Sequence, residues 1–198
     1  MPTLGEVRAR LRRALEDTDA TAPLWSDTEL NEALATAHRE YGARFPREAT
    51  TTLAAVAGQT DYALPADARR VLRVESPAGQ PLPRRPASVG HESGAAQSWA
   101  FFGGIVRLGV APASPLVVLY RGLYPFPASD AGDFGLPDEG VDLAVAGAIV
   151  LALQRREIAA AKRRGGGQPV GEALGAARRA YAQALRRCRQ LRSDAFVG

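Results

Sequence analysis

The chain has 198 residues, 46% hydrophobic and 23% charged, a balance typical of a globular protein and not of a disordered one. Its single cysteine, Cys188, excludes an internal disulfide, and an intracellular origin fits. The most apolar stretch, 141–153, is too short to cross a bilayer and contains Asp142, so it predicts a buried helix and no membrane partner.

Positive charge is concentrated near the C-terminus. The whole chain carries a net charge of +4, yet residues 143–192 hold eleven basic and only two acidic side chains, which leaves the rest net acidic. A solvated helix face explains such a run. Contact with phosphates or with an acidic partner explains it equally, and any contact with nucleic acid is expected to be nonspecific. The candidate residues are Arg178, Arg179, Arg186, Arg187, Arg189 and Arg192.

Two helices are predicted within residues 3–46. Thr3 and Glu6 have the spacing of a capping box at the start of the first helix, and apolar residues then recur at helical spacing. Ser26 and Glu29 repeat that pattern at the start of the second helix.

Residues 50–121 change to a period of two and predict a β-rich insert. Strands are expected at 50–56 and 71–75, and Gly103-Gly104 predicts a two-residue hairpin. In its first strand Trp99 and Phe101 share one face, expected to be the core, while Phe102 takes the other. The run at 115–121 is apolar on both faces and predicts a central strand.

Residues 137–192 predict two more helices, separated by three glycines at 165–167. The second of these places Leu174, Cys188 and Leu191 on one apolar stripe. A short tail follows at 193–198. The order of elements predicts an α+β fold in one domain: a small helical bundle of two N-terminal and two C-terminal helices, with an inserted antiparallel β module.

No catalytic constellation is visible. His38 and His91 have no cysteine or histidine at metal-ligand spacing, and the glycine pairs lack the form of a phosphate-binding loop. Cys188 lies on an apolar stripe, where a small core residue is expected and not a nucleophile. The sequence therefore predicts no catalytic residue, no metal site, no cofactor and no enzyme activity.

Taken in order, several short motifs resemble one family. These are W-S-D-x-E-L (25–30), G-Q-x-x-Y-x-L-P (58–65), R-V-L-R-V (70–74), P-L-V-V-L-Y-R (115–121) and L-P-D-E-G (136–140), followed by an arginine-rich helix. This order resembles the head–tail adaptor (connector, or head-completion) proteins of tailed bacteriophages and gene transfer agents, from about Leu4 to Leu191.

The resemblance implies a structural protein of the virion, made in the host cytoplasm and located at the capsid vertex. Such adaptors form a ring, usually twelve-fold, beneath the portal protein ring, with DNA passing through the channel. A downstream neck, stopper or tail protein would bind the β module. The arginines would face the channel or the neighbouring subunit, and a C-terminal tail would dock on the portal. That tail would comprise Ser193, Asp194, Ala195, Phe196, Val197 and Gly198.

Tyr62, Leu64 and Pro65 predict a structural joint between the bundle and the β module. Tyr62 would pack on the sheet, Leu64 would fill the seam with the helices, and Pro65 would end the approaching strand and fix the register of the next. Two other functions remain open from the sequence alone: a basic, nonspecific nucleic-acid-binding module, and a neck or tail-completion protein one level further down.

Overall fold

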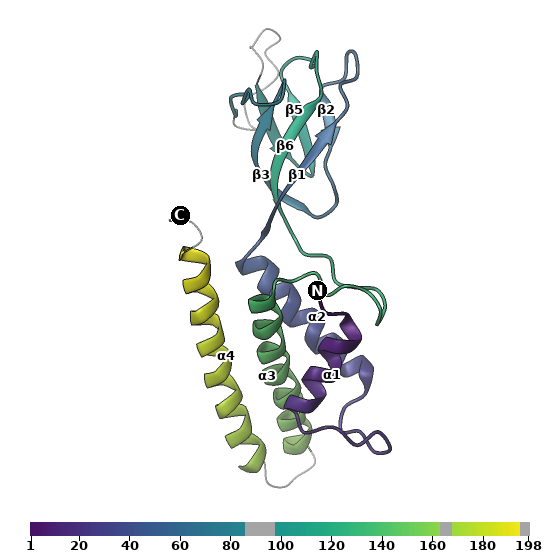
Figure 1. Cartoon of the computed structure of the whole chain (residues 1–198), viewed down its shortest axis with the longest axis vertical. Coiled ribbons are helices and arrows are strands. Elements are labelled where there is room, and N and C mark those ends of the chain that lie inside the picture. The colour runs from purple at the N-terminus through teal and green to yellow at the C-terminus, as the bar shows by residue number, and fades with distance from the viewer. Residues whose placement is uncertain (86–97, 163–167, 195–198) are drawn as a thin grey trace. The chain divides into compact units, whose positions relative to one another are not determined.

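The computed structural model describes residues 1–85, 98–162 and 168–194, and its fold class is α+β, as predicted (Figure 1). The chain divides into two compact units. Residues 1–44 and 124–198 belong to a helical unit, and residues 45–123 form a β unit. The β unit is thus an insertion in the sequence between the second and third helices.

The helical unit is built around its third helix. Its four helices are α1 (Leu4–Ala14), α2 (Asp27–Arg44), α3 (Asp138–Lys162) and α4 (Gln168–Asp194). α3 packs against each of the other three. Its sequence explains this position, because Val141, Leu143, Ala144, Val145, Ala148 and Ala152 are all buried and point to more than one side of the helix.

Both predicted N-terminal caps are present. The Thr3 hydroxyl accepts the Glu6 N–H at 3.3 Å, and the Glu6 carboxylate accepts the Thr3 N–H at 2.8 Å. At the start of α2, Ser26 and Glu29 form the same reciprocal pair at 3.2 and 2.8 Å. Each cap satisfies backbone donors that the helix cannot, which contributes about 1 kcal/mol per cap.

α4 continues through Asp194, two residues past its predicted end at 192, so Ser193 and Asp194 of the predicted docking tail are helical. Leu174 and Cys188 are buried, as their stripe predicts. The prediction is wrong for Leu191, whose side chain is 48% exposed. Leu191 lines a groove in which the residues of α3 are the polar Asp138, Glu139 and Asp142.

The β unit consists of two antiparallel three-stranded sheets. The first has the order β1 (Arg47–Leu53), β6 (Leu116–Gly122), β3 (Ala68–Glu75). The second has the order β2 (Asp61–Ala63), β5 (Ile105–Leu108), β4 (Trp99–Phe102). β6 is central in its sheet, as its two-faced apolar run predicts. β1 begins at Arg47, three residues before the predicted strand, because it pairs in register with β6 from Gly122 to Leu116.

The two sheets of the β unit share one hydrophobic core. It contains side chains from β2 to β6, among them Tyr62, Val74, Trp99 and Leu116. Gly103 and Gly104 both have positive φ, so they make the hairpin turn that the sequence predicts.

Candidate assembly surfaces

Of the two histidines, the structure describes His38. His38 is buried, and its Nε2 lies 3.1 Å from the carbonyl oxygen of Phe134. Because a carbonyl can only accept, Nε2 carries the proton. Burial lowers the pKa of His38, so the ring is held neutral. Within the described residues, no three potential ligands gather in a way that could hold a metal ion. His91 lies outside the described residues.

Among the helical residues that the structure describes, no helix is both long enough and apolar enough to span a bilayer.

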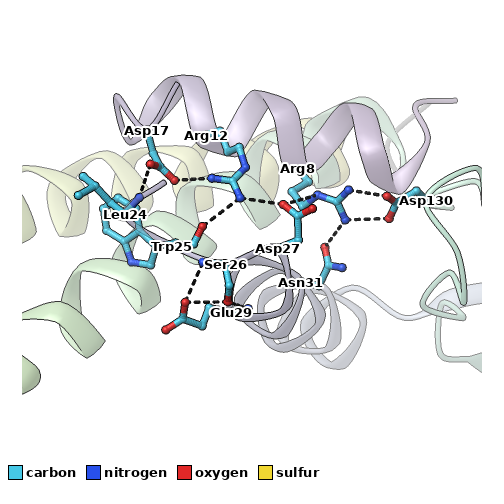
Figure 2. Close-up of polar contacts among 10 residues, drawn as sticks. All are labelled: Arg8, Arg12, Asp17, Leu24, Trp25, Ser26, Asp27, Glu29, Asn31 and Asp130. Carbon is cyan, nitrogen blue, oxygen red and sulfur yellow. Dashed lines mark hydrogen bonds and ion pairs between the residues drawn. The ribbon is translucent and has the colours of Figure 1, made fainter. Parts of the chain in front are cut away.

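An ion-pair network joins α1 to the segments that follow it (Figure 2). The Arg8 guanidinium donates to both carboxylate oxygens of Asp130, at 2.7 Å for the first, and to Asn31 at 3.2 Å. One turn along α1, Arg12 donates to Asp17, to Asp27 at 2.7 Å and to the carbonyl oxygen of Trp25 at 3.0 Å. These contacts fix the α1–α2 connection and part of the segment that precedes α3.

The Arg12 end of this network is partly buried. The Asp17 side chain is only 1% exposed and also accepts the Leu24 N–H at 2.6 Å. Arg12 is 21% exposed. The network is not predictable from the sequence, because the partners lie 5 to 122 residues away along the chain and have no shared motif. The spacing of Arg8 and Arg12, one turn apart on the same helix, was its only local signal.

The arginines predicted on α4 differ from Arg8 and Arg12 in exposure and in ion pairing. Those whose side chains the structure describes are Arg178, Arg179, Arg186, Arg187 and Arg189, and all five are exposed. Among the described residues none of them forms an ion pair with a carboxylate, whereas Arg8, Arg12 and Arg107 do. The side chain of Arg192 lies outside the described part of the chain. α4 therefore presents guanidinium groups that no carboxylate among the described residues pairs with.

Their positions around α4 divide them into two groups. At about 100° per residue, measured from the buried Cys188, four arginines lie on one side of the helix, between roughly +80° and +180°. We call this set the arginine flank: Arg178, Arg179, Arg186 and Arg189. Arg187 lies on the other side, at roughly −100°, together with Ala180, Ala184 and Leu191.

That other side of α4 lines a groove, which we call the α3–α4 groove. Its walls are Asp138, Glu139 and Asp142 of α3 and Ala180, Gln183, Ala184, Arg187, Cys188 and Leu191 of α4. Asp142 forms an ion pair with Arg10 at 2.7 Å. Asp138 and Glu139 form no ion pair within the described residues. The groove thus has a small-residue and apolar floor beside two unbalanced carboxylates.

The three residues of the predicted joint lie in the β unit. Tyr62 is 4% exposed in the core of that unit, and its hydroxyl accepts the Val56 N–H at 3.1 Å. Leu64 is half-buried and packs against the same core. Pro65 lies two residues past the end of β2. The chain passes between the units at 44–45 and 123–124, so a role of these residues as a joint between the units stays a prediction.

A second exposed feature lies at the tip of the β4–β5 hairpin. Trp99 is buried, as predicted, while Phe102 is 80% exposed. Ile105 stands directly opposite Phe102 in the register and is 38% exposed. The sequence predicts that Phe102 points away from the core, but it gave no reason to expect an exposed apolar pair at the turn.

Comparison with known families decides the class of protein. The sequence model of the SU10 adaptor protein family matches residues 2–197, nearly the whole chain. The chain belongs to this family of phage adaptor proteins. A search of curated proteins finds no match. The match confirms the resemblance to head–tail adaptors. The adaptor is therefore a structural phage protein that associates with other proteins of the virion.

Proposed function

We propose that the adaptor forms a homo-oligomeric ring beneath the portal at the capsid vertex, where it connects the capsid to the neck or tail and lets DNA pass. Membership of the adaptor family, which covers residues 2–197, is the observation that carries this proposal. A ring needs surfaces that bind a neighbour head to tail. The exposed arginines of α4, which have no carboxylate partner in the described residues, are suited either to such contacts or to passing DNA.

The portal-facing element is the C-terminus. The docking segment comprises Ser193 to Gly198: Ser193 and Asp194 are the last residues of α4, and residues 195–198 lie outside the described residues. Ala195-Phe196-Val197 supplies an apolar anchor for a groove on the portal. The β unit would then bind the downstream neck, stopper or tail protein, with the exposed Phe102 and Ile105 as its apolar contact.

The test is co-sedimentation of the purified adaptor with its cognate portal ring. We expect saturation near one adaptor per portal subunit, twelve for a twelve-fold portal. A chain that ends after Asp194 should keep its helices, measured by circular dichroism, and lose portal binding. Full-length adaptor that does not bind the portal at micromolar concentration contradicts the proposal and favours a neck or tail-completion protein further down.

A basic nucleic-acid-binding module is the second candidate function, favoured by the exposed arginines of α4. Contact with DNA in a channel should be weak, since tight binding would hinder passage. The salt dependence of DNA binding separates the two functions, because each neutralised phosphate steepens the fall of affinity with salt. Nanomolar affinity of the isolated chain at physiological salt would favour the nucleic-acid-binding module.

A further inference from the structure

We propose that the arginine flank of one adaptor subunit docks into the α3–α4 groove of the next subunit. The inference rests on the proposed ring and identifies the surfaces that close it. The occupant of the groove is a second copy of this chain, and the contact is heterologous, since the two surfaces differ.

Charge complementarity is the first argument. The flank carries Arg178, Arg179, Arg186 and Arg189, none of which has a carboxylate partner in the described residues. The groove carries Asp138 and Glu139, which likewise have no ion pair there. The three carboxylates that line the groove outnumber its one arginine, Arg187. Arg10 pairs with Asp142, so Asp138 and Glu139 are the carboxylates that can attract the flank. Both lie in the first turn of α3, where the helix dipole also stabilises them.

The position of the two surfaces is the second argument. They lie on opposite sides of the same helix. They also lie at the same height: the flank spans 178–189 and the α4 wall of the groove spans 180–191, each about 16 Å along the axis. A neighbour can therefore be reached by rotation about an axis nearly parallel to α4, with little shift along it. Such a contact closes into a ring, whereas a large shift along the axis would produce a helical filament.

The composition of the surfaces favours protein over DNA as the occupant. Ala182 lies between the arginines of the flank and Leu185 lies at its edge, and both are only half-buried. The groove opposite offers Ala180 and Ala184, whose small side chains allow close approach, and the 48% exposed Leu191. Arginine interleaved with apolar side chains is typical of protein interfaces. A phosphate backbone requires only the charge.

Two charge-reversal variants test the contact. The groove variant is Asp138→Lys with Glu139→Lys, and the flank variant is Arg186→Glu with Arg189→Glu. Rings are counted on the cognate portal by sedimentation. Each variant alone places like charges at every interface, so ring formation should fall at least about tenfold. A control with two reversals on the exposed side of β3, Arg69→Glu with Arg70→Glu, should assemble as the unmodified chain does.

A mixture of the two variants is decisive. At a 1:1 ratio every interface can pair opposite charges: an unmodified flank with an unmodified groove, or a reversed flank with a reversed groove. We expect the mixture to recover rings that contain both chains, which misfolded variants could not do. If the unmodified chain forms rings on the portal and neither variant reduces ring formation, the inference is wrong but the proposed function stands. Failure of the unmodified chain to bind the portal overturns the proposed function instead.

The same variants also test whether the arginine flank contacts DNA and not a neighbouring subunit. If the flank variant still forms rings but no longer retains DNA at low salt, the arginine flank faces the channel and the docking inference is wrong.

Discussion

Replacement of Arg12 by alanine tests whether the ion-pair network holds the helical unit together. The change removes the cationic partner of Asp17, whose side chain is 1% exposed, and a donor to the carbonyl oxygen of Trp25. Removing one member of a buried pair costs about 3–5 kcal/mol, because the remaining charge is left uncompensated. Arg12 is 21% exposed and Asp17 keeps the Leu24 N–H, so we expect the lower end, about 3 kcal/mol.

The neighbouring arginine supplies a matched control. Arg13 lies in the same last turn of α1, so it has the same helix propensity and the same interaction with the helix dipole. Its side chain is exposed and has no ion pair among the described residues. Arg13→Ala should therefore change the free energy of unfolding by no more than about 0.5 kcal/mol.

Urea unfolding measures both variants. Circular dichroism at the helical wavelength reports on the helical unit, because the four described helices all belong to it. The midpoint of Arg12→Ala should shift to lower urea at an unchanged slope. If Arg12→Ala and Arg13→Ala lie within about 0.5 kcal/mol of each other, the Asp17 pair does not hold the α1–α2 connection and the reasoning is wrong.

The remaining predictions concern packing and pH. Leu64→Ala removes a half-buried side chain from the β core and should cost about 2 kcal/mol, and a loss under about 0.5 kcal/mol in urea unfolding contradicts its packing role. Burial lowers the pKa of His38 below 6.5, so as the pH falls His38 is protonated in the unfolded chain before it is protonated in the folded one. Stability should therefore decrease from pH 7 to 5.5. His38→Gln should flatten this dependence of the melting temperature on pH. The new Cβ of Gly175→Ala would meet only the end of an arginine side chain at 3.6 Å, so this change should stabilise α4 by about 0.5–1 kcal/mol. At Gly140 a new Cβ would lie 2.7 Å from the buried ring of Tyr41, and this clash should remove the gain. Equal melting temperatures for Gly175→Ala and Gly140→Ala would contradict this contrast.

Local signals predicted most of the fold. Capping pairs such as Thr3 and Glu6, and the turn at Gly103-Gly104, act over a few residues, so a pattern in the chain carries the whole interaction. The run at 115–121, apolar on both faces, likewise placed β6 at the centre of its sheet. The sequence indicated β2 only as the strand that Pro65 ends and not by its bounds, because its pairing with β5 is set by contacts more than forty residues apart.

The candidate surfaces were only partly predictable. The sequence indicates that α4 is rich in arginine, but whether a guanidinium is paired depends on carboxylates far away in the chain. Arg8 finds Asp130 across 122 residues, while Arg186 finds no carboxylate among the described residues. The groove was not predictable either, since it forms where the first turns of α3 lie beside the last turns of α4. Leu191 was placed in the core because periodicity gives the side of a helix but not what covers it.

The arginines of α1 and of α4 differ in how far carboxylates of the described residues offset their charge. Arg186 and Arg189 are three residues apart and repel each other by about 0.2–0.5 kcal/mol, and the helix dipole offsets such repulsion only within the last turn. Arg178 and Arg179 lie far from that turn. On α1, Arg8 and Arg12 are paired with carboxylates of the helical unit, whereas Arg13 is exposed like the arginines of α4. Repulsion between side chains that the described fold does not offset is expected on a surface that binds a partner. In the proposed docking contact, the carboxylates of a neighbouring subunit supply negative charge to α4, and the apolar side chains beside the arginines favour a protein surface there.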